Sequence, residues 1–452
     1  MKHLTHNKKG SVLIITLVLG TVSTVIMMAM ASYALFEHRA TSHKHYRDSA
    51  LHIAEAGISY YRWHLAHDPD DFWDGNATST PGPYVHDYTD KDGNIIGTFS
   101  LEIDAPSAGE NIVTIRSTGR TLAKPNSERT LQVRMGKASL ADFTFLQNSN
   151  MSFSPTTIVS GKVHSNGGIE FNGTTDAEVQ SARETYTVSG VERDGVWGDG
   201  GPAEFFQFPI PTVDFDSISG DLALLKSLAE EPEGYHRNSS GSQGYHVIFL
   251  ANGTFDLYRV TSKLGYCQWW GWCVGQWYDI GNTTFIENAS IPSNGAMFFD
   301  DDVWVEGVVN GRVTVAAGRF PENSSNYRKI YISDNITYNE VGSDDVLGLI
   351  AQGDIIVPLN VPEDMTIQAA ALSQHGGIGR PLYRSSYANS LQDNLTFFGS
   401  QLGFESNGWK WGTPPVSGFT NTNHIYDGNL RYSPPPGFPT KDTYDLISWE
   451  EL

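Results

Sequence analysis

Residues 11–36 read SVLIITLVLGTVSTVIMMAMASYALF, a run without Asp, Glu, Lys or Arg. As an α-helix this run spans roughly 39 Å, whereas the hydrocarbon core of a bilayer is roughly 30 Å thick. The run is therefore long enough to cross a membrane. The ten residues before it, MKHLTHNKKG, are polar and basic, and Lys8 and Lys9 lie next to the apolar run. These lysines predict that this end stays in the cytoplasm and that the rest of the chain lies outside.

A secretory signal peptide is the alternative interpretation of this N-terminus. A signal peptide usually has a shorter apolar core, followed by a small-residue cleavage site. Here the helical pattern continues through residues 37–65, which read EHRATSHKHYRDSALHIAEAGISYYRWHL. Apolar and small residues recur at spacings of three and four, which predicts an amphipathic helix with one packing stripe. That stripe consists of Leu35, Tyr46, Ala50, Ile53, Ala54, Gly57, Ile58, Tyr61 and Leu65.

Three features follow one another at the start of the chain: a basic leader that ends in Gly10, an apolar helix, and the sequence ALHIAEAGISYYR at residues 50–62. In this order they resemble the N-terminal module of PilX-type minor pilins, and the resemblance covers residues 8–65. It implies that a prepilin peptidase cleaves the leader between Gly10 and Ser11.

The resemblance also assigns a family motif to the stalk. The alanine-glutamate-alanine signature and the glycine after it fall on Ala54, Glu55, Ala56 and Gly57. Ordinary major pilins have a glutamate at the fifth mature position, where this chain has Ile15. The implied partners are the membrane, other pilin subunits and the prepilin peptidase. The implied location is a single pass through the inner or cytoplasmic membrane, with the C-terminal part outside, at the cell surface or in a type IV pilus.

The remainder of the chain is predicted to be mainly β. Alternating apolar residues at 97–104, 111–120 and 129–136 predict strands of a small antiparallel sheet, which needs a helix to cover it. The expected fold class is thus α+β, because a long helix and this sheet precede a larger β domain. The predicted divisions are a leader at 1–10, a transmembrane and stalk helix at 11–66, a pilin-like sheet at 67–138, and a passenger at 139–452 with an insertion at about 185–290.

Short β-prone runs recur in the passenger, from Val303 onward at intervals of roughly 20 to 25 residues. Such a period is typical of solenoids. A right-handed parallel β-helix is therefore the predicted fold, and a β-sandwich with long loops is the alternative. Within the insertion, we expect a helix that starts near Ser217 and a hairpin that turns at Asn252 and Gly253. The expected inward-facing residues are Val305, Ile330, Ile332, Ile350, Ile356, Ile367, Leu372 and Phe397.

The formal net charge of −21 argues against nucleic acid as a ligand, because an acidic surface repels it. The two cysteines, Cys267 and Cys273, lie in the run CQWWGWC. They can close a hairpin disulfide if their Cα atoms approach within about 7 Å. Two free thiols in an aromatic cluster are the alternative, and the spacing does not match a zinc site.

Four tryptophans crowd around these cysteines: Trp269, Trp270, Trp272 and Trp277. Exposed aromatic faces can stack on sugar rings or on a partner chain, so this segment is the candidate binding patch, with surface glycans as a candidate ligand. The alternative is that the rings are buried as a satellite core.

No catalytic residue, metal or cofactor is predicted. Asp300, Asp301 and Asp302 form the densest acidic run of the passenger. We interpret them as charges that protect an exposed strand edge against aggregation. The run QHGGIGR, with His375 and Arg380, is interpreted as a turn. The other candidate metal sites are the stalk histidines His38, His43, His45 and His52 and the turn at Asp90, Asp92 and Gly93, and neither has the spacing of a known site.

The favoured function is accordingly a structural, minor pilin-like subunit. The alternatives are a surface adhesin that binds carbohydrate and an anchored enzyme that acts on polysaccharides.

We expect the protein recovered from cells to begin at Ser11, because the resemblance places the peptidase cut after Gly10. Intact-mass measurement and N-terminal sequencing test this directly. A chain that still begins with Met1 would contradict leader processing and favour a simple membrane anchor.

Overall fold

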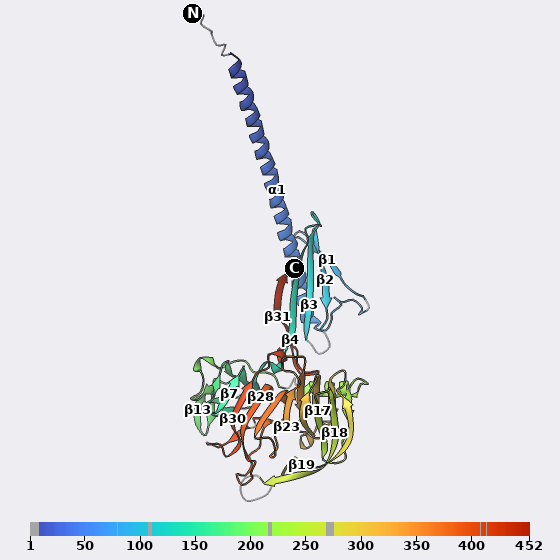
Figure 1. The fold of residues 1–452 in the computed structure, drawn as a ribbon, viewed down its shortest axis with the longest axis vertical. Helices are drawn as coiled ribbons and strands as arrows, with labels where there is room; N and C mark the ends of the chain where they lie inside the picture. Colours follow the sequence, from blue (N-terminus) through green and yellow to red (C-terminus); the bar gives the residue numbers. More distant parts are fainter. Residues whose placement is uncertain are drawn as a thin grey trace, which may run out of the picture. The chain divides into compact units, whose positions relative to one another are not determined.

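The computed structural model describes residues 9–78, 80–106, 111–215, 219–267, 275–406, 408–412 and 414–452 (Figure 1). They divide into two compact units. The first unit comprises Met1–Ala105, Val113–Gly136 and Tyr444–Leu452, and the second comprises Pro106–Ile112 and Lys137–Thr443. From the sequence we predicted that all of 139–452 belongs to the passenger. The structure groups the last nine residues, Tyr444–Leu452, with the first unit.

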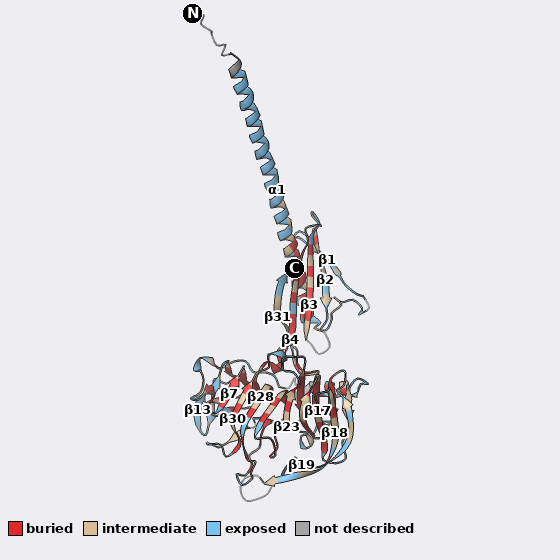
Figure 2. Cartoon of the chain, in the orientation of Figure 1, coloured by how far each residue is buried: buried red, intermediate tan, exposed pale blue. Residues whose placement is uncertain are grey.

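The N-terminal helix α1 runs without a break from Lys9 to His67. Its apolar first half is exposed: Leu13 and Phe36 are each 70% exposed, and the side chains between them are similarly open (Figure 2). By length and composition α1 can cross a membrane. The predicted stripe is confirmed from Ala50 to Leu65, where the side chains are buried, but not at Leu35, which is 60% exposed.

The second half of α1 packs on a five-stranded sheet that belongs mostly to the first unit. Its strands, in spatial order, are β1 (Tyr84–Thr89), β2 (Ile95–Asp104), β3 (Ile112–Thr121), β4 (Arg129–Ser139) and β31 (Thr440–Glu451). Alternate residues such as Leu101, Ile115 and Val133 form one buried cluster with Ile58 and Tyr61 of α1. The predicted strands β2, β3 and β4 are confirmed. The sequence analysis missed β1 and β31, whose polar edge-strand sequences carry few buried residues.

Small residues let α1 approach this sheet closely. A Cβ atom added at Gly119 of β3 would lie 2.1 Å from the carbonyl oxygen of Ala50 and 2.5 Å from the backbone nitrogen of Ala54. A Cβ atom at Gly57 would lie 2.3 Å from Oγ of Ser117. The contact therefore depends on glycine on both the helix and the strand.

A half-buried carboxylate, that of Asp71, holds the chain in place just after α1. Asp71 accepts hydrogen bonds from Nε2 of His64 at 2.9 Å and from the backbone N–H groups of Trp73 and Gly75 at 2.8 and 2.6 Å. Burial raises the pKa of Asp71, but these hydrogen bonds outweigh it and hold the pKa below its ordinary value. The network fixes where the chain leaves the helix.

The second unit is built mainly from parallel strand ladders. The long ladder has the order β16 (Tyr235–Arg237), β20 (Ala296–Phe299), β22 (Arg312–Ala317), β24 (Val346–Ala351), β26 (Asp364–Ser373), β28 (Leu391–Gly403), β5 (Phe145–Gln147), β8 (Val163–Ser165), β11 (Val179–Ser181) and β15 (Phe206–Gln207). A second ladder links β17 (Gly244–Leu250), β21 (Val303–Val309), β23 (Ile330–Tyr338), β25 (Ile355–Ile356) and β27 (Ile378–Gly379).

Shorter pairings complete the second unit. Parallel neighbours are β28, β30 (Ser417–Ile425), β7 (Thr157–Ser160) and β10 (Thr174–Thr175), and likewise β6 (Met151–Phe153), β9 (Ile169–Phe171) and β14 (Val196–Trp197). Antiparallel pairs are β12 (Thr185–Val188) with β13 (Val191–Asp194), β18 (Thr254–Cys267) with β17 and β19 (Gly275–Ser290), and β29 (Lys410–Trp411) with β30. The helices are α2 (Ser219–Glu230) and the short 3₁₀ turns η1 (Leu140–Asp142), η2 (Ala203–Phe205), η4 (Ser324–Asn326) and η5 (Gly428–Arg431).

The chain enters the long ladder in its middle. The first strand, β5, pairs with β28, which comes more than 240 residues later in the chain. From β5 the chain builds outward to β15, then crosses to β16 at the far end and builds back to β28. The entry and exit segments therefore meet, and the backbone N–H of Leu140 donates to the carbonyl of Pro439 at 3.0 Å.

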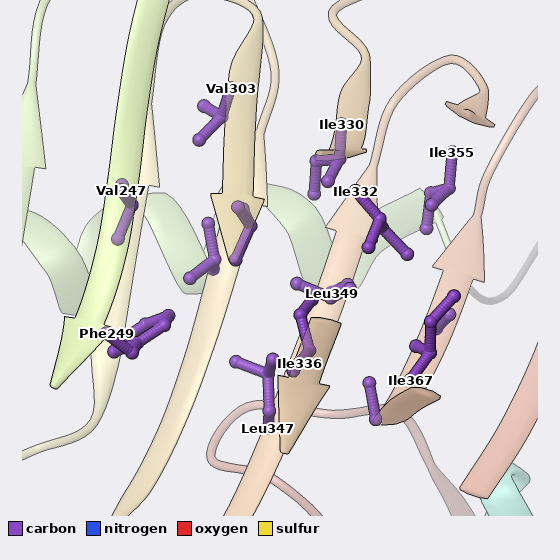
Figure 3. Close-up of a cluster of buried hydrophobic side chains, with 14 of the residues drawn as sticks. Val247, Phe249, Val303, Ile330, Ile332, Ile336, Leu347, Leu349, Ile355 and Ile367 are labelled. Carbon is purple, nitrogen blue, oxygen red and sulfur yellow. The ribbon is translucent and has the colours of Figure 1, made fainter. Parts of the chain in front are cut away.

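The long ladder is buried on both faces. One face contributes to a large cluster that includes Val303, Ile332 and Leu349, shown in Figure 3. The other face packs on Leu222 and Leu225 of α2. All eight residues expected to face inward are buried, but they do not share one interior: Ile350 and Leu372 belong to the cluster under α2, and Ile356 packs in a third cluster with Trp304.

The region expected to be an insertion is partly ladder. Both β16 and β17 pair in parallel with later strands. Among the described residues of this region, β12–β13, α2 and β18–β19 lie outside the parallel ladders. The predicted hairpin is confirmed, with Leu250 opposite Thr254 and Gly253 at a φ of 79°. The predicted helix is confirmed as α2, which begins at Ser219.

We expect Gly119→Ala to destabilise the first unit by about 1–3 kcal/mol, because its Cβ atom meets helix backbone that cannot rotate away. Pulse proteolysis of the full chain in detergent, at increasing urea, measures the midpoint of unfolding. Ser59→Ala, at an exposed position of α1, is the control and should leave the midpoint within error. Equal midpoints for Gly119→Ala and the native chain would contradict the close helix–sheet contact.

Candidate functional site

The family motif at the end of the stalk helps to pack the helix against the sheet in this structure. Ala54 is fully buried and Gly57 is buried one turn later, so both face the sheet. Glu55 points away from that contact, and its carboxylate lies 3.0 Å from Nδ1 of His52. Ala56 is half-buried. The motif therefore serves the helix–sheet contact, and Glu55 is available on the outer surface of the stalk.

The predicted leader cut falls in the first turn of α1. The helix begins at Lys9, so Gly10 and Ser11 are both helical in this structure. Cleavage between them stays a prediction.

Most of the aromatic segment lies outside the described residues. These are Trp269, Trp270, Trp272 and Cys273. The antiparallel hairpin that carries them is described: Cys267 ends β18 opposite Gly275 of β19, and Trp277 pairs with Gly265. The disulfide between Cys267 and Cys273 and the binding patch on the tryptophans stay predictions.

The base of this hairpin is fixed to the second unit by a buried carboxylate. Asp279 of β19 is 6% exposed and accepts hydrogen bonds from the backbone N–H groups of Leu359 and Asn360 at 3.1 and 2.9 Å. On the facing strand, the hydroxyl of Tyr266 accepts from Nδ2 of Asn360 at 2.6 Å. Burial raises the pKa of Asp279 above its ordinary value.

A buried arginine holds the other side of the same segment. Arg380 is fully buried and donates to the carbonyl oxygens of Leu359 at 2.8 Å, Pro358 at 3.3 Å and Gly418 at 2.8 Å, and also to Asn389. Burial lowers the pKa of Arg380 to about 10. Asp279 binds the N–H groups and Arg380 binds the carbonyls of one stretch of chain, so together they fix the hairpin base.

The sequence analysis missed this role of Arg380, because it interpreted QHGGIGR as a simple turn. The backbone partners lie 9 to 38 residues away in the chain, which no local motif encodes. His375 of the same run stacks on Tyr327, with ring centroids 4.4 Å apart.

The acidic run forms three separate attachments. It lies in the corner between β20 and β21 and not in a strand, so the interpretation of an edge-guarding strand is wrong. Asp300 pairs with Lys226 of α2 at 2.5 Å and Asp302 with Lys263 of β18 at 2.9 Å. Asp301 is 4% exposed and accepts from the backbone N–H of Ser240 at 3.0 Å. Each of the three carboxylates thus attaches a different segment to the turn between β20 and β21.

Within the described ranges, no group of three or more His, Cys, Asp or Glu side chains is arranged to hold a metal ion. The turn at Asp90 is a hairpin turn between β1 and β2, as expected, with Gly93 at a φ of 85°.

Comparisons with known proteins place few constraints on this chain. No protein-family model matches it, and no curated protein matches it. Among solved structures it is similar to the competence-associated pilin ComZ of Thermus thermophilus, with 14% sequence identity over 90% of this chain and 97% of that chain. The TM-score is 0.30, which is too low to infer a shared fold.

We expect Arg380→Met to destabilise the second unit by about 3 kcal/mol, because it leaves several buried carbonyls without donors. Arg259→Met, at an exposed position of β18, is the matched control. Urea unfolding of the full chain in detergent, followed by circular dichroism, measures both. Arg380 has no structural role if the two variants unfold at the same urea concentration.

Proposed function

We propose that the chain is a membrane-anchored, extracytoplasmic structural subunit of a type IV pilus or a related filament, of the PilX-type minor pilin class. The observation that carries this proposal is the two-part environment of α1. Its residues from Val12 to Phe36 are apolar and exposed, whereas the apolar stripe between Ala50 and Leu65 is buried on a sheet.

Exposed apolar surface of this extent is unfavourable in water. Burying one Leu, Ile, Val or Met side chain contributes about 1.5–3 kcal/mol, and the first half of α1 carries many of them. Among the described residues, none covers this part of the helix. A lipid bilayer or the apolar helices of neighbouring subunits would cover it, which supports both the anchor and the filament.

The proposed topology follows from the flanking charges. Lys8 and Lys9 favour a cytoplasmic N-terminus, so that the sheet and the second unit lie outside. The proposed partners are the membrane, other pilin subunits and a prepilin peptidase, and the proposed location is the inner membrane and the pilus or cell surface.

For the second unit we propose a parallel β-helix. The successive parallel pairings of β16, β20, β22, β24 and β26, with a second ladder from β17 to β27, support this architecture over a β-sandwich, in which antiparallel pairing dominates. Parallel crossover connections are right-handed in the great majority of proteins, which supports the right-handed form.

We propose a structural role for the acidic run in place of a catalytic one. Glycoside-cleaving enzymes need two carboxylates held together at the scissile bond. Asp300 and Asp302 each pair with a separate lysine, on α2 and on β18, which supports an attachment role.

The anchor is tested by fractionating cells that express the full chain. We expect the chain in the membrane fraction, resistant to alkaline carbonate, and in fibres sheared from the cell surface. Val18→Lys with Val25→Lys should release the chain from the membrane, because two ammonium groups at the middle of a bilayer cost several kcal/mol. Thr41→Lys, beyond the apolar run, is the control and should stay in the membrane.

Recovery of the native chain in the soluble cytoplasmic fraction would overturn the anchor. Recovery in membranes but never in sheared fibres would overturn the filament assignment and leave the anchor.

A further inference from the structure

A cavity of about 350 Å³ lies within the second unit. Its walls come from β5, from β6, from the segment around β29 and from β30, which are far apart in the sequence. A volume of this size falls in the range of small-molecule sites, roughly 300–1,000 Å³. None of the predicted site residues lines it.

One wall of the cavity contains His424, and its hydrogen bonds fix which ring nitrogen carries the proton. Nε1 of Trp409 donates to Oε1 of Gln401 at 3.0 Å, and an indole nitrogen can only donate. The amide nitrogen of Gln401 therefore donates to Nδ1 of His424 at 2.9 Å, and the proton of the neutral imidazole is on Nε2. Burial, together with the charge of Lys410, lowers the pKa of His424 to about 3, so the ring stays neutral.

A lysine without a carboxylate partner lines the same cavity. Nζ of Lys410 donates to Oγ1 of Thr156 at 2.8 Å and to the carbonyls of Thr156 and Thr420, both at 3.3 Å. Among the described side chains, no Asp or Glu forms an ion pair with it, and its hydrogen-bond acceptors are all uncharged oxygens. Burial lowers the pKa of Lys410 to about 8.

A third polar group in the wall, the side-chain oxygen of Gln147, accepts no hydrogen bond among the described residues. Gln147 is 4% exposed, and its Oε1 is buried with no hydrogen-bond partner among the described residues. A buried acceptor without a donor costs about 1–3 kcal/mol unless a ligand or water supplies one. The remaining wall is largely aromatic, with Phe145, Phe153 and Trp411.

We propose that this cavity binds an acidic sugar, a single hexuronate residue with its carboxylate toward Lys410 and His424. The carboxylate supplies the missing counter-charge and accepts from Nε2–H of His424. A ring hydroxyl supplies the donor that Oε1 of Gln147 lacks, and a face of the sugar ring packs on the aromatic wall. The inference does not depend on the membrane anchor, and the net charge of −21 means that recognition rests on these local contacts.

The test is calorimetry on the full chain in detergent. The probes are methyl galacturonoside and methyl glucuronoside, with methyl galactoside, methyl glucoside and acetate as comparisons. We expect at least one uronoside to bind at least tenfold more tightly than its neutral counterpart and than acetate. If neither uronoside binds the folded chain, or if the neutral sugars or acetate bind equally well, the proposal is overturned.

Two variants locate the site. Lys410→Met should weaken uronoside binding at least tenfold, while Lys441→Met, an exposed lysine of the same unit, should not change it. We expect the Gln147→Met variant to fold, because the oxygen that it removes has no hydrogen-bond partner. It should leave the unfolding midpoint unchanged or higher and weaken binding severalfold. Native affinity in both Lys410→Met and Gln147→Met would place any binding elsewhere and overturn this site.

Discussion

The structure depends on one helix that needs two different environments. Over its first half α1 offers apolar side chains that the described part of the chain leaves exposed, and over its second half it supplies the core of the first unit. The two halves form one continuous helix, and its second half contacts the sheet closely at Ala54 and Gly57. The hydrophobic effect acts on both halves, but among the described residues only the second half packs on apolar side chains of the chain itself.

A second constraint concerns how the large β unit is attached. Its main segment, Lys137–Thr443, runs from the end of β4 to the start of β31, which are neighbours in the five-stranded sheet, so the two ends of this segment have to meet. The ladder satisfies this because the chain enters beside its own last long strand, with β5 next to β28. The hydrogen bond between Leu140 and Pro439 joins the entry and exit segments of this unit.

Local patterns in the sequence predicted much of this fold. The long N-terminal helix, the stripe from Ala50 to Leu65 and the alternation in β2, β3 and β4 depend on neighbours a few residues apart, and all three are confirmed as structural elements. Features that depend on distant pairing were not predicted: the polar strand β31, the entry of β5 beside β28, and the burial of Ile350 and Leu372 under α2. The site residues divide in the same way. A charged residue in a glycine-rich turn gives no sign that it is buried, as Arg380 is, and the cavity brings together Gln147, Lys410 and His424 only after folding.

The most direct test of the two-environment helix is site-specific photo-crosslinking in membranes, with a photoreactive amino acid at Leu19 or at Trp63. Both side chains are exposed, at 65% and 59%, but they lie in different halves of α1. The account predicts adducts with lipid or with another apolar helix from Leu19, and no lipid adduct from Trp63. Equal lipid labelling at both positions, or none at Leu19, would contradict it.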